Sequence, residues 1–117
     1  MKVKRLLLIE DDQDTVQLIR ALLASSGHWE LRHVSLGQQV LASIQERRPD
    51  AILLDGHLPD MEGQEVLHLL SECPSTCSIP VISFSALGSL EGEQVVGIVE
   101  KPFQPMDFIP QLDALMG

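Results

Sequence analysis

Two short apolar runs constrain the fold of this chain most strongly. Residues 6–9 (LLLI) and 51–54 (AILL) contain no polar side chain, and each run ends directly before an acidic residue. Runs of this length are typical of strands that are buried on both faces, as in a parallel sheet. We therefore expect these two segments to lie at the centre of a sheet that is covered on both sides.

The rest of the chain alternates between strand and helix patterns. Strands are predicted at residues 6–9, 29–33, 51–54, 80–84 and 95–99, and helices around residues 16–24, 36–46, 66–73 and 105–116. Segment 29–33 alternates apolar and charged residues, which is typical of an edge strand, and Asp12 or Asp14 is expected to cap the first helix. This order predicts a single α/β domain over residues 1–117, with a doubly wound, five-stranded parallel sheet and helices on both faces.

One connection is too short for this pattern. About nine residues, 86–94, join the fourth and fifth strands, and they include two glycines. A crossover between parallel strands normally needs a dozen residues or more. The helix between these strands is therefore predicted to be reduced or absent, with at most one helical turn.

Charge and composition exclude several functions. The chain has 8 Lys and Arg against 17 Asp and Glu, a net charge of −9. This acidity argues against direct nucleic-acid binding through a basic face and against binding to an anionic membrane. No apolar run approaches the length of a membrane span, and Cys73 and Cys77 suggest ordinary reduced thiols, so we expect a cytoplasmic protein.

Polar side chains follow the predicted strands. Glu10, Asp11 and Asp12 follow the first, Asp55 the third, Ser85 the fourth and Lys101 the fifth. Lys101 is the only Lys or Arg after Arg48. Because ligands of open α/β sheets bind at the carboxyl ends of the strands, these groups are expected to meet there, where carboxylates could hold Mg²⁺ and one could accept a phosphoryl group. Each residue also has an ordinary alternative as a helix cap, a turn residue or a solvated charge.

The motifs resemble the receiver domain of bacterial response regulators, which has a flavodoxin/CheY-like fold, over essentially the whole chain. The matching segments are residues 7–12 (LLIEDD), 53–63 (LLDGHLPDMEG), 80–86 (PVISFSA) and 101–103 (KPF). An aspartate followed by proline four residues later and by glycine eight residues later is specific when the other segments accompany it.

The resemblance implies a role for each of these side chains. Asp55 would be the phosphoacceptor, and Ser85 and Lys101 would bind the phosphoryl group. Asp11 would be a direct Mg²⁺ ligand together with Asp55 and the backbone carbonyl of His57. Glu10 would act through water, and Asp12 is a less favoured alternative if the acidic pair is shifted by one residue.

Three positions depart from the family pattern. The 86–94 connection is short, Ile98 replaces the usual Tyr or Phe three residues before the lysine, and Pro110 is expected to kink or delay the last helix. Two positions that tune dephosphorylation in the family hold His57 and Leu87, which predicts slow loss of the phosphoryl group. The loop from Ser85 to Gln94 would be the element that responds to phosphorylation.

Two functions remain open from the sequence. The first is a signalling receiver that takes a phosphoryl group from a histidine kinase or a histidine phosphotransfer protein and then changes its binding to an unknown downstream protein. It would catalyse only its own phosphorylation and dephosphorylation, as a monomer or a homodimer. The alternative is a receiver-like interaction or dimerisation module that no longer switches.

Overall fold

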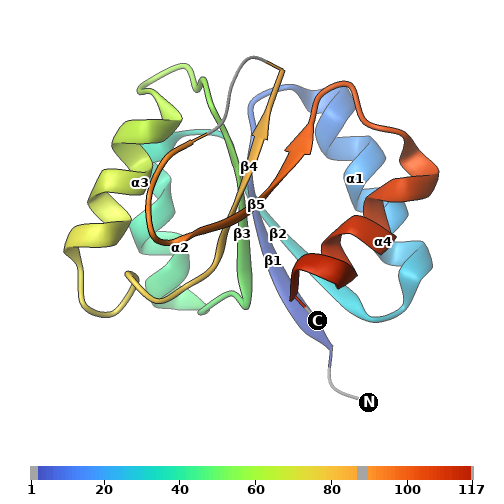
Figure 1. The fold of residues 1–117 in the computed structure, drawn as a ribbon, viewed down its shortest axis with the longest axis horizontal. Helices are drawn as coiled ribbons and strands as arrows, with labels where there is room; N and C mark the ends of the chain where they lie inside the picture. Colours follow the sequence, from blue (N-terminus) through green and yellow to red (C-terminus); the bar gives the residue numbers. More distant parts are fainter. Residues whose placement is uncertain (1–2, 87–89, 117) are drawn as a thin grey trace.

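A central parallel sheet organises the computed structural model, which describes residues 3–86 and 90–116 (Figure 1). Its strand order is β2-β1-β3-β4-β5, and every neighbouring pair is parallel. The strands are β1 (Lys4–Ile9), β2 (Trp29–Val34), β3 (Ala51–Asp55), β4 (Val81–Ser85) and β5 (Val95–Glu100). The predicted parallel sheet is confirmed, with segment 29–34 at one edge.

Helices cover both faces of this sheet. They are α1 (Gln13–Ser26), α2 (Val40–Glu46), α3 (Gly63–Glu72) and α4 (Pro105–Met116), and a 3₁₀ turn at Gly37–Gln39 precedes α2. Figure 1 shows α1 and α4 on one face and α2 and α3 on the other. Asp12 caps α1, since its carboxylate accepts a hydrogen bond from the Thr15 amide at 3.2 Å, and Gly27 ends the helix with a φ of 76°.

The apolar runs alternate between two cores. In β1, Leu6 and Leu8 pack beneath α1 and α4, whereas Leu7 and Ile9 pack beneath α2 and α3. Side chains of a strand point alternately to opposite faces, so a strand that is covered on both sides needs an apolar residue at every position. This is why the four-residue runs identify the centre of the sheet.

The connection between β4 and β5 contains no helix among its described residues, 86 and 90–94, which agrees with the prediction. Leu90 is buried there, and its amide donates to the Ser83 hydroxyl at 3.1 Å. The Gln64 side chain accepts from the Glu91 amide at 3.1 Å and donates to the Glu91 carbonyl at 2.8 Å. The side-chain amide of Gln94 donates, through Nε2, to the carbonyls of Thr76 and Ile79. Side-chain amides therefore hold this segment in place of a helix.

The last helix differs from expectation in one respect. It begins at Pro105 and continues through Pro110, so the prediction that Pro110 delays the helix is wrong. Pro110 lies on the exposed side of α4, and the residue whose carbonyl it leaves without a donor, Met106, is 90% exposed. Water can hydrate that carbonyl, which makes the missing hydrogen bond tolerable.

None of the helices in the described part of the chain has the length and apolar character needed to cross a membrane.

Candidate functional site

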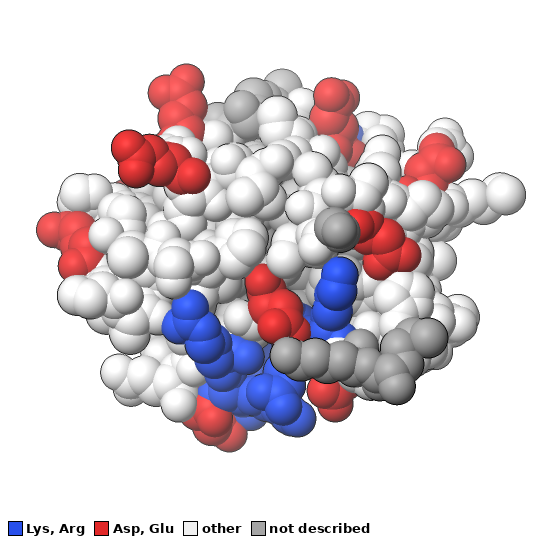
Figure 2. Space-filling view, turned by 60° about the horizontal axis from the view of Figure 1, so that its bottom comes forward, with Lys and Arg blue, Asp and Glu red and all other residues white. Residues whose placement is uncertain are grey.

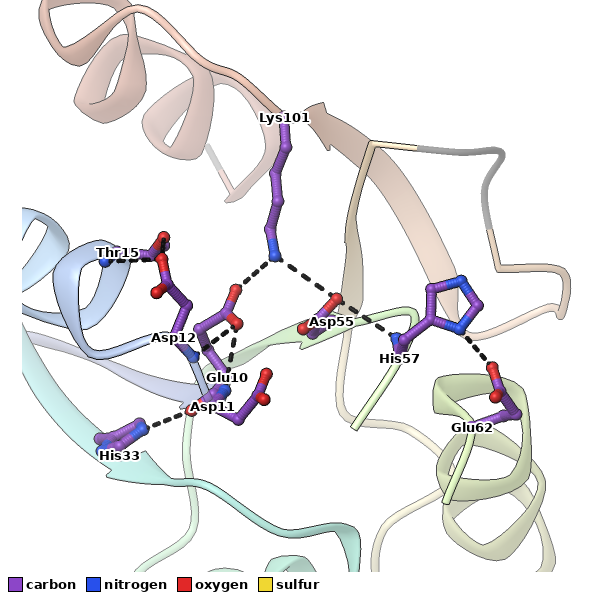
Figure 3. A network of polar contacts seen from close by, with 9 residues as sticks. All are labelled: Glu10, Asp11, Asp12, Thr15, His33, Asp55, His57, Glu62 and Lys101. Carbon is purple, nitrogen blue, oxygen red and sulfur yellow. Dashed lines mark hydrogen bonds and ion pairs between the residues drawn. The ribbon is translucent and has the colours of Figure 1, made fainter. Parts of the chain in front are cut away.

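The predicted site residues meet at the carboxyl ends of the strands (Figure 3). β1 and β3 are neighbours, so Glu10 and Asp11, which follow β1, lie beside Asp55 at the end of β3. One carboxylate oxygen from each of these three residues lies within 4.8 Å of the others. Glu10 and Asp55 are buried, whereas Asp11 is exposed. Clustered carboxylate oxygens of this kind suit a hard divalent cation, so the residues present fit a Mg²⁺ ion.

Glu10 is the most constrained of these acids. Its Oε2 accepts hydrogen bonds from the backbone amides of Asp11 and Asp12, both at 3.1 Å. Burial raises the pKa of Glu10, and the hydrogen bond from Lys101 opposes that shift. The carbonyl of Glu10 lies 2.7 Å from Nε2 of His33, a contact from β2 that the sequence did not suggest. Glu10 is thus fixed from several sides.

Asp12 has a different role from its two neighbours. Its carboxylate is bound to the backbone amide and the hydroxyl of Thr15, at 3.2 Å and 2.5 Å. The hydroxyl bond and then the amide bond lower the pKa of Asp12. Among the described residues, the acids that converge are Glu10, Asp11 and Asp55, so the geometry favours the alignment in which Asp12 is a helix cap.

Lys101 reaches into the cluster from the end of β5. Its ammonium lies 2.5 Å from Oε1 of Glu10 and 3.4 Å from Oδ1 of Asp55, and its side chain is 23% exposed. The same nitrogen lies 4.5 Å from the centroid of the Phe84 ring, which forms one wall. One cation is therefore shared between two buried carboxylates, which offsets the repulsion between them.

Ser85 is placed by β4 and is buried at the same edge of the sheet. Its carbonyl accepts a hydrogen bond from the Lys101 amide at 3.2 Å. A Cβ on Gly56 would come within 3.2 Å of the Ser85 hydroxyl, so that hydroxyl lies beside the residue that follows Asp55. The structure thus brings Asp55, Ser85 and Lys101 together from three neighbouring strands.

His57 lies in the loop that follows Asp55. Its amide donates to Oδ1 of Asp55 at 3.3 Å, and Nδ1 of its ring lies 2.5 Å from Oε2 of Glu62. The sequence did not identify Glu62 as a partner of His57, because the contact depends on a loop that turns back on itself. The assignment of the His57 carbonyl as a ligand stays a prediction, and Leu87 lies outside the described residues.

The basic residues gather mainly at the other end of the molecule. Arg5, Arg32 and Arg47 line a small pocket near the amino ends of β1, β2 and β3. Figure 2 shows Lys and Arg side chains close together on this side. Lys101 is therefore set apart in space as well as in sequence.

A parallel sheet with an aspartate, a hydroxyl, a lysine and a pair of acids at its carboxyl edge defines a class of phosphoacceptor domain. The chain matches the response regulator receiver domain family over residues 6–113, and it belongs to that family. The predicted resemblance is confirmed.

Individual relatives agree with this assignment. The chain is 31% identical to the phosphate regulon transcriptional regulatory protein PhoB of Pseudomonas aeruginosa, over 97% of this chain and 52% of PhoB, so it spans about half the length of that relative. It is 29% identical to the polar-differentiation response regulator DivK of Brucella anthropi, over 97% of each chain. It is also similar to the receiver domain of sensor histidine kinase PA1611 from P. aeruginosa, whose structure has a magnesium ion in the active-site cleft (26% identity, TM-score 0.84, 98% of each chain).

Proposed function

We propose that Asp55 accepts a phosphoryl group from the phosphohistidine of a histidine kinase or a histidine phosphotransfer protein, in a Mg²⁺-dependent reaction. An Asp55 oxygen would form a bond to phosphorus as the bond between phosphorus and the imidazole nitrogen breaks. The observation that carries this proposal is the convergence of Asp55 with two further acids and with Lys101. The family, whose members serve phosphorylation-dependent signalling, supports it.

Each neighbouring side chain has a role in this reaction. Lys101, now 3.4 Å from Asp55, would move its ammonium onto a phosphoryl oxygen, and the Ser85 hydroxyl would bind another. Glu10, Asp11 and Asp55, with the His57 carbonyl, would hold Mg²⁺, which when bound neutralises charge on the phosphoryl group. The magnesium ion in the related PA1611 receiver domain supports this assignment.

The protein would catalyse only its own phosphorylation and dephosphorylation, and it would work in the cytoplasm, where its kinase partner phosphorylates it. Loss of the phosphoryl group is expected to be slow. Leu87 has no group that could orient an attacking water, and the contact with Glu62 occupies Nδ1 of the His57 ring, which leaves only Nε2 of that ring to act on water. An acyl-phosphate half-life of seconds in Mg²⁺ would contradict this expectation.

Incubation with acetyl phosphate and Mg²⁺ tests the phosphoacceptor directly. Intact mass should rise by one phosphoryl group in the natural protein and in Asp107→Asn, an exposed control on α4. Asp55→Asn should show no increase. Labelling of Asp55→Asn, or no labelling of the natural protein by acetyl phosphate or by any phosphohistidine donor, would overturn the proposal.

A second candidate is a receiver-like module that binds a partner or a second copy without switching. The position of Ile98 favours it, because this residue replaces the usual aromatic residue and is 48% exposed. Residues 90–94 are also held by the hydrogen bonds of Gln64 and Gln94, which a rearrangement of the loop would have to break. Identical backbone amide spectra of residues 90–100 before and after phosphorylation would favour the non-switching module, and altered spectra the switch.

A further inference from the structure

Strand β5 is an open edge of the sheet. It pairs with β4 on one side, and no further strand of the described chain lies beyond it. Gly97 and Val99 lie opposite Ile82 and Phe84, and the Lys101 amide donates to Ser85, so these peptide groups face β4. In a parallel ladder the intervening residues point the other way, which leaves the peptide groups of Ile98 and Glu100 facing outward. Val96 lies at a register irregularity, since Val95 pairs with Val81 and Gly97 with the next residue, Ile82. Such an edge offers hydrogen-bonding groups to another strand.

The side chains on this edge are unusually apolar for a surface strand. Val96 is 46% exposed and Ile98 is 48% exposed. Ile98 pairs with Ser83 in register, so its side chain lies on the face of the sheet where Ser83 receives the Leu90 amide. The described part of the 86–94 connection supplies no helix there. Ile98 is therefore an exposed apolar residue on a face of β5 that no helix of the described residues 86 and 90–94 covers.

The opposite edge of the same sheet is protected. β2 carries Glu30 and Arg32, which form ion pairs with Arg47 and Glu46 at 3.7 Å and 2.8 Å. Charged side chains on an edge strand oppose its pairing with another chain. β5, with the sequence VVGIVE, has only its last residue charged. Charged side chains therefore oppose the pairing of another strand with β2, whereas β5 has no such side chains before its last residue.

The negative charge around β5 favours one kind of binding partner for this strand. Glu91, Glu93 and Glu100 are all exposed, while the ammonium of Lys101 is turned inward to Glu10. A second copy of this chain would bring the same acids and a net charge of −9 to the contact, which opposes self-association. A basic segment would instead find opposite charge at both ends of the strand.

We propose that the open edge of β5 binds an extended, positively charged segment of a partner protein as an added strand. Its backbone pairs with the outward peptide groups of Ile98 and Glu100. Because alternate side chains of a strand share one face, every second residue of the segment is apolar and packs against Ile98. Lys or Arg residues at its ends lie near Glu93 and Glu100. The side chains of this surface take no part in the phosphoryl transfer proposed for Asp55.

Two synthetic peptides test the proposal. One alternates Lys and Val over seven residues with blocked ends, and the other replaces each Lys by Glu. In a titration of ¹⁵N-labelled protein, the Lys peptide should shift the amide signals of Val96, Ile98 and Glu100, and added salt should weaken the binding. The Glu peptide should not bind.

Matched variants distinguish binding of the Lys peptide at the β5 edge from its general electrostatic attraction to the acidic protein. Ile98→Lys should weaken binding of the Lys peptide at least about tenfold, equivalent to about 1.4 kcal/mol. Leu18→Lys makes the same charge change at an apolar residue of α1 that is 39% exposed, and it should leave the affinity nearly unchanged. Ile98→Asn, which keeps the net charge, should also weaken binding, and an unchanged urea midpoint shows that each variant is folded.

Three results would overturn the proposal. The first is equal affinity of the Lys peptide for the natural protein and both Ile98 variants. The second is binding of the Glu peptide with similar affinity. The third is a dimer in sedimentation equilibrium that Ile98→Lys abolishes and Leu18→Lys does not, since a second copy would then be the occupant of this edge.

Discussion

Gly63 shows how closely the backbone packs beside the phosphoacceptor. Its amide donates to the Gly56 carbonyl at 2.8 Å, which closes the loop after Asp55 at the start of α3. A Cβ at this position would lie 2.3 Å from the Asp55 carbonyl oxygen and 3.0 Å from the Gly56 Cα. Both neighbours are backbone atoms, which cannot turn away as the end of a side chain can. The glycine eight residues after Asp55 is therefore required by contact.

Gly63→Ala should disturb both stability and phosphorylation. We expect a loss of about 1–3 kcal/mol in the free energy of unfolding, because the added methyl group overpacks the loop. Phosphorylation of Asp55 by acetyl phosphate should also be slower, since the Asp55 backbone must shift. Urea denaturation and intact-mass time courses measure the two effects.

Gly27→Ala is the control for this substitution. Gly27 has a φ of 76°, but a Cβ at this position would meet only open space within 4 Å, so alanine there is strained without touching the site. It should cost about 1 kcal/mol and leave the phosphorylation rate unchanged. If Gly63→Ala were as stable and as reactive as the natural protein, the close-contact explanation would be wrong.

At the scale of elements, Asp113 joins α4 to the start of β2. Its Oδ1 accepts a hydrogen bond from the Trp29 indole at 2.9 Å, and both its oxygens lie 3.0 Å from Nε2 of His28. Partial burial raises the pKa of Asp113, but the bonds from Trp29 and His28 outweigh it and leave that pKa below its usual value. Contacts with the Ser26 carbonyl and then with Asp113 raise the pKa of His28.

These shifts predict a pH window for the stability of this contact. The lowered pKa of Asp113 stabilises the fold above the unfolded value of about 4, and this contribution is lost as the pH falls through the folded pKa. The raised pKa of His28 stabilises the fold fully below about pH 6.5, and this contribution is lost as the pH rises through the folded pKa. Asp113→Asn should therefore lower the urea midpoint most between about pH 4 and 6.5.

Asp107→Asn is the matched control on the same helix, because Asp107 is exposed. Because Asp107 lies in the first turn of α4, Asp107→Asn should lower the urea midpoint slightly and by a similar amount at pH 5 and pH 9. An Asp113→Asn variant whose midpoint differs from the natural protein by the same amount at pH 5 and pH 9 would show that the His28 ion pair contributes nothing.

Pro110 offers a stabilising substitution in α4. It lies inside the helix on its exposed side, where it donates no hydrogen bond to the preceding turn. Pro110→Ala should raise the free energy of unfolding by about 1–2 kcal/mol, the helix penalty of proline less the entropy that proline removes from the unfolded chain. Thermal or urea unfolding measures this, and a lower midpoint in the variant would contradict it.

At the scale of the whole molecule, the fold gathers negative charge at the carboxyl ends of the central strands. A net charge of −9 includes Glu10, Asp11 and Asp55, which the fold holds within a few ångströms of one another. Arginines meet at the opposite end of β1, β2 and β3 instead of neutralising these acids. Lys101 supplies one positive charge against these three acids, so the folded protein keeps a local repulsion that a divalent cation would relieve.

Mg²⁺ should accordingly stabilise the natural protein by mass action. At a concentration of Mg²⁺ about 100 times its dissociation constant, the gain in the free energy of unfolding is about 2.7 kcal/mol. NaCl of equal ionic strength should raise the urea midpoint less than Mg²⁺ does, because it only screens the repulsion between the acidic side chains. Asp11→Asn should remove the difference between the two salts, and an equal effect of both salts on the natural protein would exclude a specific site.

Much of the fold is readable from local patterns. The runs at residues 6–9 and 51–54 predicted the central strands, the alternating segment 29–33 predicted an edge strand, and the short 86–94 connection predicted a missing helix. Each pattern reflects how many faces of an element are covered, which the order of apolar residues records directly. The expectation that Pro110 delays the last helix was wrong because it did not consider which side of the helix faces water, and the alternative of a kink stays a prediction.

The candidate site, like the fold, was predictable from the sequence only in part. Side-chain chemistry at the strand ends, and the family to which the chain belongs, follow from residues that are close in the sequence. The separation of Asp11 from Asp12, the sharing of Lys101 between Glu10 and Asp55, the contact of His57 with Glu62 and the exposure of Ile98 came only from the tertiary structure. These features depend on which strands are neighbours and on how loops turn back, and Glu10 and Lys101 are 91 residues apart. Distances between such groups arise from strand order and packing, which no local pattern of residues encodes.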